Sequence, residues 1–232
     1  MIPLGDDNTG RIRIPFVNYI LIAINIAVFI FLQNLGSNDH FLLSYALIPE
    51  EILTGKDYIT ESGVGVSPSP VHLTLLSSMF MHGGIAHLAG NMLYLWVFGD
   101  NLENRMGHLK YLIFYLLCGL VASLSHVMLT AIMGSQSFVP SLGASGAISG
   151  VLGGYLLLFP KNIVRVWVFA FVMRVPAFIT LGLWIALQLF SGYGSLGSEG
   201  GGVAYAAHIG GFFAGMILVN FFKTKERGRN FV

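Results

Sequence analysis

Apolar runs long enough to cross a lipid bilayer constrain this sequence more than any other feature. A membrane-spanning helix needs about 20 predominantly apolar residues. The clearest run is 16–35, FVNYILIAINIAVFIFLQNL, which follows two arginines and has no small-residue cleavage site. We therefore interpret it as an uncleaved first span rather than as a signal peptide.

Composition supports the same interpretation for the whole chain. Apolar residues make up 55% of the 232 positions and charged residues only 10%, whereas soluble domains carry about 25% charged residues. So few charges cannot keep a protein surface in water, which excludes a soluble globular protein, a disordered chain and a nucleic-acid binder. The single cysteine, Cys118, lies in an apolar run, so no intrachain disulfide is expected.

We expect an all-α polytopic membrane protein, a single domain over residues 1–232 with six transmembrane helices. The five further spans are predicted at 85–102, 109–133, 143–159, 176–190 and 203–222. Two apolar pieces, 41–48 and 163–173, are too short to cross, and we expect both to lie in the membrane interface. As a helix the second piece would reach only about 16 Å.

The basic residues predict an orientation. If the N-terminus is on the inner side, 11 of the 12 Lys and Arg residues fall on that side and only Lys56 lies outside. Such a bias is typical of cytoplasmic loops. We therefore expect both termini in the cytoplasm, and the compact six-span chain indicates a prokaryotic plasma membrane. The sequence leaves the oligomeric state open.

Polar residues inside spans are costly and therefore mark candidate functional sites. His87 and Asn91 lie four apart in the second span, on one helical face, while Ser145 and His208 lie near the starts of the fourth and sixth spans. In the expected orientation all three spans run from outside to inside. The four side chains then lie about 3–10 Å below the outer end, where they can converge on one site.

Glycines predict that the fourth and sixth spans pack closely. The fourth span has glycine at every fourth position from 146 to 154, and the sixth has Gly211 and Gly215. Close packing would bring Ser145 and His208 within hydrogen-bond reach, and a serine beside a histidine is an activated nucleophile with its general base. The free backbone N–H groups at the start of the fourth helix are suited to an oxyanion.

Three motifs of this chain resemble those of the rhomboid intramembrane serine proteases. They are His87 and Asn91 as H-x-x-x-N, residues 143–146 as G-x-S-G, and residues 207–215 as A-H-x-x-G-x-x-x-G. The segment 79–82, Glu103 and Gly107 are similar to that family as well, and the resemblance extends from about residue 73 to residue 215.

The resemblance implies a serine endopeptidase that cleaves transmembrane segments of single-span membrane proteins near the outer face of the bilayer. In that case Ser145 would be the nucleophile, His208 the general base, and His87 with Asn91 the oxyanion-hole donors. The expected partners are such substrates and the lipid bilayer, with no nucleic acid.

The chain departs from the family pattern in two places. Leu73 and Thr74 stand where family members often have Trp-Arg, so the packing of the first loop is expected to differ. Ser149 stands where some members have a tyrosine that stacks on the base, so His208 must be oriented in another way.

A metal site built from His82, His87 and His208 is disfavoured. A spacing of five puts the first two about 140° apart on a helix, unlike the one-face pair of a zinc protease. Asp100 and Glu103 lie about 20 Å further along the helix from His87, so we expect a Ser–His dyad without an acidic third member. No metal and no cofactor are expected, and His82 is interpreted as fixing the loop before the second span.

Two other classes of function stay open at this point. A non-proteolytic rhomboid-like protein that binds membrane helices would need Ser145 or His208 to be missing, and both are present. A transporter would need inverted repeats and ionisable groups at the membrane midplane, and we find neither. The loop 191–202 has six glycines in twelve residues, and we expect it to act as a movable cap.

Overall fold

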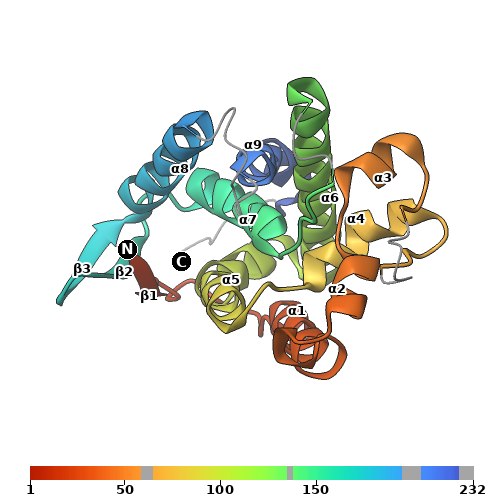
Figure 1. The fold of residues 1–232 in the computed structure, drawn as a ribbon. Coiled ribbons are helices and arrows are strands. Elements are labelled where there is room, and N and C mark those ends of the chain that lie inside the picture. Colours follow the sequence, from red (N-terminus) through yellow and green to blue (C-terminus); the bar gives the residue numbers. More distant parts are fainter. Residues whose placement is uncertain (59–64, 135–137, 195–204, 225–232) are drawn as a thin grey trace, which may run out of the picture.

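The computed structural model describes residues 1–58, 65–134, 138–194 and 205–224, most of them in helices (Figure 1). The longer helices are α1 (Phe16–Ala27), α5 (Ile85–Met106), α6 (His108–Met133), α7 (Ser145–Leu158), α8 (Ala177–Gly194) and α9 (Tyr205–Phe222). The shorter ones are η1 (Val28–Leu32), η2 (Asn34–Gly36), α2 (Asp39–Tyr45), α3 (Pro49–Thr54), η3 (Val71–Leu73), α4 (Thr74–Ser77) and η4 (Ser78–Phe80). The strands are β1 (Ile2–Gly5), β2 (Ile163–Val168) and β3 (Phe171–Pro176).

Each of the six predicted spans overlaps one of the longer helices, and α5 and α8 continue four residues beyond the predicted ends. Among the described residues, α6, α8 and α9 are both long enough and apolar enough to cross a membrane. The first span, α1 continued by η1, and the fourth, α7, are apolar but shorter. The structure therefore supports a helical membrane bundle, and the count of six crossings stays a prediction.

The segment 163–173 forms strands, so the expectation of an all-α chain is wrong at this point. Strands β2 and β3 form an antiparallel hairpin, and β1 pairs with the other edge of β2. Val164 and Val166 are buried while Arg165 and Trp167 face outward, an alternation with the period of a strand. The same alternation is present in the sequence, whereas the length of the segment excludes only a membrane-crossing helix.

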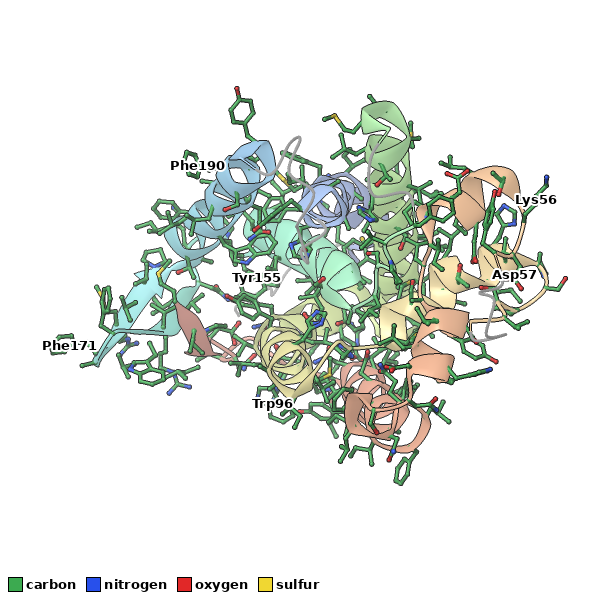
Figure 2. The ribbon with its side chains drawn as sticks, in the orientation of Figure 1. Lys56, Asp57, Trp96, Tyr155, Phe171 and Phe190 are labelled. Carbon is green, nitrogen blue, oxygen red and sulfur yellow. The ribbon has the colours of Figure 1, made fainter. Side chains whose placement is uncertain are left out.

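The sheet lies at the margin of the molecule. Figure 1 shows it beside α8 at one side of the helices, with α2, α3 and α4 on the opposite side. Phe171, at the start of β3, is 72% exposed and projects away from the helices (Figure 2). The hairpin therefore leaves the helical bundle intact and extends from its edge.

The piece 41–48 is divided between the end of a short helix and a buried extended segment. Helix α2 ends at Tyr45, and the next three residues are buried. Within them, Leu47 exchanges two backbone hydrogen bonds with Ser141, at 2.8 and 2.9 Å. This bridge ties the region after α1 to the loop that leads into α7.

Helices α7 and α9 pack backbone against backbone, as the glycine spacing predicts. A Cβ atom added at Gly215 would overlap the backbone oxygen of Gly150, and one at Gly211 would overlap that of Gly146. Gly150 also lies against Cys118 of α6, so α7 is enclosed by α6 and α9. Only glycine allows this approach, which holds the starts of α7 and α9 together.

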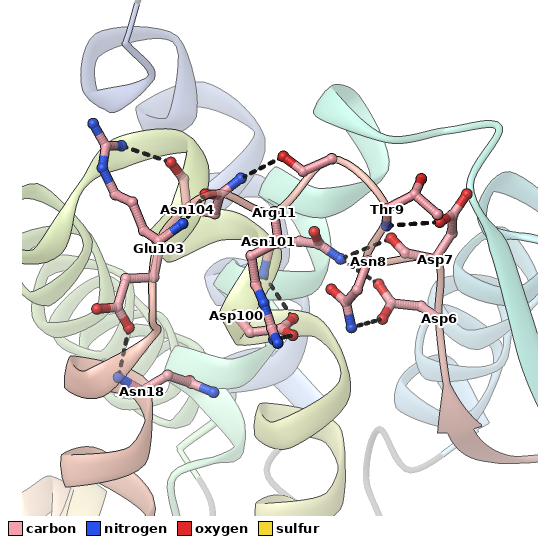
Figure 3. A network of polar contacts seen from close by, with 12 residues as sticks. Asp6, Asp7, Asn8, Thr9, Arg11, Asn18, Asp100, Asn101, Glu103 and Asn104 are labelled. Atoms are coloured by element: carbon pink, nitrogen blue, oxygen red, sulfur yellow. Dashed lines mark hydrogen bonds and ion pairs between the residues drawn. The ribbon is translucent and has the colours of Figure 1, made fainter.

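Polar side chains form a network where α5 ends (Figure 3). The buried carboxylate of Glu103 accepts hydrogen bonds from the backbone N–H groups of Val17 and Asn18, at 3.0 and 2.7 Å, and so caps the start of α1. Arg11 pairs with Asp100 at 2.8 Å. We call this the Glu103 end of the bundle, and the opposite end, where α5, α7 and α9 begin, the Ser145 end.

The same network holds the segment that follows β1. A side-chain oxygen of Asp6 accepts hydrogen bonds from the amide of Asn101, at 2.6 Å, and from the hydroxyl of Tyr155. Burial raises the pKa of the Asp6 carboxyl to about 7. The N-terminal segment is thereby fastened to both α5 and α7.

Candidate active site

Ser145 is the first residue of α7, and the loop before it is held firmly. Besides the bridge at Ser141, the N–H group of Gly143 donates to the carbonyl of Ser78 at 2.9 Å. Gly143 has a φ of +131°, and a Cβ atom there would lie 2.9 Å from the ring of His87. Both the conformation and the close approach require glycine at this position.

His208 lies in the first turn of α9, and its ring contacts Ser145. The Nε2 atom of His208 is 2.8 Å from the Oγ atom of Ser145, within hydrogen-bond range. The glycine contacts between α7 and α9 described above hold the two helix starts at this separation. The contact expected between these two side chains is therefore present.

The second ring nitrogen of His208 has a partner that the sequence analysis does not predict. Its Nδ1 atom is 2.7 Å from the Oε1 atom of Gln188, on α8. The ring of Trp184, one turn earlier on α8, lies with its centroid 6.1 Å from that of His208. Gln188 is a polar residue inside a predicted span, so the criterion that selects His87 and Asn91 could have found it.

His87 and Asn91 lie in the first turns of α5, facing the same region. Asn91 is 9% exposed, and its side-chain Nδ2 atom has no hydrogen-bond partner among the described residues. The Nδ1 atom of His87 accepts a hydrogen bond from the N–H group of Gly83 at 3.3 Å. Asn91 therefore retains an unused donor.

One cavity of about 500 Å³ joins these side chains at the Ser145 end. Its lining includes all four predicted site residues, together with Ser123 and His126 of α6. The bridged loop before α7 forms another wall of it. The contribution of α6 is not predicted from the sequence, because neither Ser123 nor His126 belongs to a recognised motif.

His82 is held through its backbone. The side-chain amide of Gln33 donates to the carbonyl of His82 at 2.8 Å, and the His82 N–H group donates to the Gln33 oxygen at 2.9 Å. The ring of His82 is buried beside that of His87, at a centroid distance of 5.1 Å. These bonds fix the loop before α5. The two ring nitrogens of His82 have no hydrogen-bond partner among the described residues.

The arrangement has the parts that acyl transfer requires. A serine hydroxyl lies against an imidazole nitrogen that can accept its proton. The start of α7 presents backbone N–H groups, and the amide of Asn91 faces the same cavity. Such donors can stabilise a negative charge that develops on an oxygen atom.

Comparison with known proteins finds similarity along most of the chain. The family model of the rhomboid domain matches residues 71–224. "Rhomboid protein 1, mitochondrial" from Saccharomyces cerevisiae is 32% identical over 201 residues, which are 86% of this chain and 51% of the relative. "Rhomboid protease GluP" from Bacillus subtilis is 29% identical over 201 residues, 84% of this chain and 35% of that protein.

A mammalian relative gives a similar result. "Presenilin-associated rhomboid-like protein, mitochondrial" from Mus musculus is 29% identical over 156 residues, 63% of this chain and 37% of that protein. The chain thus spans about half of the yeast relative and a smaller part of the other two.

Proposed function

The chain belongs to the rhomboid family and is a membrane protein, and we propose that it is an intramembrane serine endopeptidase acting on transmembrane segments of single-span membrane proteins. The main support is the 2.8 Å contact between Ser145 Oγ and His208 Nε2, inside a cavity at one end of a helical bundle. We assign Ser145 as the nucleophile and His208 as the general base of a dyad.

In the proposed reaction, Ser145 Oγ attacks the carbonyl carbon of the scissile peptide bond while His208 Nε2 takes the hydroxyl proton. The carbonyl electron pair moves onto oxygen and then returns, which expels the amine of the leaving segment. That amine takes the proton from His208, and an acyl ester remains on Ser145. A water molecule, deprotonated by His208, then attacks the ester carbonyl. The bond from the carbonyl carbon to Ser145 Oγ breaks, Oγ takes the proton back from His208, and a carboxylic acid product leaves.

We assign His87 and Asn91 as donors to the oxyanion. The unused Nδ2 donor of Asn91 is available to a carbonyl oxygen that acquires charge in the cavity. Asparagine donates without carrying a charge of its own, so the donor is present at every pH. The backbone N–H groups at the start of α7 supplement it.

The substrate is proposed to enter laterally past α8. The buried residues of α8 lie in its first turns, at Ala177, Thr180 and Leu181, while Phe190 near its end is 79% exposed and projects outward (Figure 2). The amide groups of a helix are shielded from attack, so the substrate must unwind before it is cut. Substrates with Gly or Pro near the cut should be cleaved best.

Joining α8 to α5 tests this entry route. Tyr94 and Leu187 line one small cavity, so we choose cysteines at these positions as the pair for a bifunctional crosslinker. The joined protein should cleave a membrane substrate slowly and recover on release, whereas each single cysteine variant should cleave normally. Undiminished cleavage while joined would refute lateral entry. Most of the expected cap, 191–202, lies outside the described residues.

The orientation belongs to the same proposal. We place the Glu103 end in the cytoplasm and cleavage near the outer face, because 11 of 12 basic residues fall on the inner side of the predicted topology. We propose a prokaryotic plasma membrane as the location. Protease protection of tags at the two termini in right-side-out vesicles tests the orientation, and cleavage of either tag from outside would reverse it.

Labelling with a fluorophosphonate probe tests the central assignment. We expect an adduct on Ser145 by mass spectrometry, and cleavage of a synthetic single-span substrate that Ser145→Ala reduces by about 10⁴-fold or more. Ser123→Ala removes another hydroxyl from the same cavity and should leave both measurements unchanged. A protein that binds the substrate helix without cleaving it, or one that conducts solute in proteoliposomes, would overturn the protease assignment.

A further inference from the structure

The side chain of Gln188 contacts the ring of His208 from a different helix. Gln188 is half-buried on α8, 20 residues before His208, and its Oε1 atom lies 2.7 Å from His208 Nδ1. On the other side of the ring, Nε2 lies 2.8 Å from Ser145 Oγ. The imidazole is thus held between an amide oxygen and a serine hydroxyl.

These two contacts select one tautomer of a neutral imidazole. Such a ring carries one N–H group, on either nitrogen, and an amide oxygen can only accept a hydrogen bond. The Gln188 oxygen therefore requires the proton on Nδ1. Nε2 is then bare and accepts the hydrogen of Ser145, as a general base must.

Other groups that could orient the ring do not replace this bond. Ser149 stands where some rhomboid proteins have a stacking tyrosine, and its hydroxyl donates to the carbonyl of Ser145 at 2.6 Å. The ring centroid of Trp184 lies 6.1 Å from that of His208, and the two ring planes are tilted by 39°. An indole ring offers no hydrogen-bond acceptor to Nδ1. Among the described residues, the other titratable side chains that line the cavity with His208 are His87 of α5 and His126 of α6, and neither is a carboxylate.

We propose that Gln188 is a positioning residue for His208: its side-chain oxygen holds the proton on Nδ1 and keeps Nε2 available to Ser145. The inference rests on the proposed function, because it describes how that base is oriented. When His208 takes the serine proton, the same oxygen stabilises the Nδ1–H of the imidazolium. Since Gln188 belongs to α8, the base is correctly set only while α8 is packed against α9.

Two substitutions of similar length separate the acceptor from the bulk of the side chain. Gln188→Met removes the acceptor, and we expect kcat and the rate of probe labelling at Ser145 to fall about 10- to 100-fold, within the range of general base catalysis, with KM unchanged. Gln188→Glu retains an acceptor that cannot flip into a donor, and it should recover most of the activity near neutral pH. Leu189→Met, an exposed neighbour on α8, is the matched control and should behave as wild type.

The pH dependence of kcat/KM distinguishes a positioning role from a merely structural one, because a structural role would leave it unchanged. A carboxylate beside Nδ1 stabilises imidazolium and raises the pKa of the base, so the acidic limb of kcat/KM in Gln188→Glu should move to higher pH. Equal activity and pH profiles in wild type and Gln188→Met would overturn the proposal. So would a Gln188→Glu variant that is no more active than Gln188→Met while both unfold at the wild-type temperature.

Nitrogen NMR of ¹⁵N-histidine-labelled protein reports the tautomer without any need for turnover. We expect the proton of His208 on Nδ1 in wild type and a mixture of tautomers in Gln188→Met. A wild-type ring protonated on Nε2 would overturn the inference even if the enzyme is active. An inactive wild type whose Ser145 does not label would instead refute the proposed function, while the tautomer result would still stand on its own.

Discussion

The two ends of the helical bundle both contain polar residues, but they use them differently. At the Glu103 end, carboxylates, amides and backbone groups are joined to one another, and no buried side-chain atom of this network lacks a partner among the described residues (Figure 3). At the Ser145 end, the described side chains include the unpaired Nδ2 atom of Asn91 and two unpaired ring nitrogens of His82. A cavity of about 500 Å³ lies there as well.

The difference separates polar groups that stabilise the fold from polar groups that are available to a ligand. An unsatisfied buried donor costs about 1–3 kcal/mol, so a folded chain retains one only where the surrounding structure compensates for it. The Glu103 end avoids that cost by pairing its groups. At the Ser145 end the unpaired donor of Asn91 lies beside a cavity that a substrate carbonyl could enter. Locally unfavourable polar groups of this kind are expected at functional sites.

Two asparagines on the same helix give the largest expected contrast. If Asn91 stabilises the oxyanion, Asn91→Ala should lower kcat by about 10²–10³ with little change in KM, because the bond strengthens only in the transition state. Asn101→Ala, at the other end of α5, should leave kcat unchanged and lower stability by about 1 kcal/mol, because Asp6 loses a donor.

Steady-state kinetics and thermal unfolding of both variants decide between the two roles. Asn91→Ala should remain folded and still label slowly at Ser145. If it instead loses thermal stability while its folded fraction turns over at the wild-type rate, Asn91 is structural and the oxyanion assignment is wrong.

The sequence was sufficient for what depends on local period and spacing. The helices follow from the apolar runs, and the approach of α7 to α9 follows from glycines at every fourth position, which places His208 beside Ser145. The hairpin of β2 and β3 is local, and its alternation is present in the sequence. Strand β1 could not be found in this way, because it is separated from its partner β2 by about 160 residues.

The contacts of Gln188 and Glu103 were not predicted, because they too depend on tertiary packing. Gln188 stands out in the sequence only as a polar residue inside a predicted span, and the packing of α8 on α9 is needed to reveal its contact with His208. Glu103 is recognisable as similar to the family from the sequence, but its role in capping α1 depends on a contact across 85 positions of the chain.

Glu103 gives the next contrast, at the fully paired end. Each oxygen of its buried carboxylate accepts a backbone N–H group at the start of α1, and Oε1 also contacts the ring of His108. Glu103→Gln replaces one acceptor by a donor, so we expect a loss of about 1.5–3 kcal/mol of stability. At about 2–4 °C per kcal/mol, Tm in detergent should fall by roughly 3–12 °C.

The matched control for that change is Glu50→Gln. Glu50 is only half-buried on α3, and its side chain has no hydrogen bond or ion pair among the described residues, so Tm should stay within about 1 °C of wild type. The folded Glu103→Gln protein should label at Ser145 as fast as wild type. Slower labelling by folded protein would mean that the two ends are not independent.

The smallest expected effect is a pH dependence at the Glu103 end. Burial raises the pKa of Asp6 to about 7, above the ordinary value of a carboxyl group. Between the ordinary value and about pH 7, the folded chain holds a proton that the unfolded chain has lost. The contribution of Asp6 to stability is therefore full at low pH and declines as the pH rises through that window.

Asp6→Asn retains an oxygen that can accept from Tyr155 and Asn101 but cannot ionise. We expect it to unfold at a higher temperature than wild type above pH 7, by about 2–4 °C if the difference is near 1 kcal/mol, and at a similar temperature near pH 4.

Asp7 is the matched control, because it is exposed and its hydrogen bond with the Thr9 N–H group lowers its pKa. Asp7→Asn should therefore show no advantage at high pH, and its deficit should shrink as the pH falls below the ordinary carboxyl value. If the difference between Asp6→Asn and wild type does not vary with pH, Asp6 is ionised in the folded protein and does not couple the N-terminal segment to pH. Probe labelling at Ser145 should be unchanged in both variants at neutral pH, since neither aspartate lines the cavity at the other end.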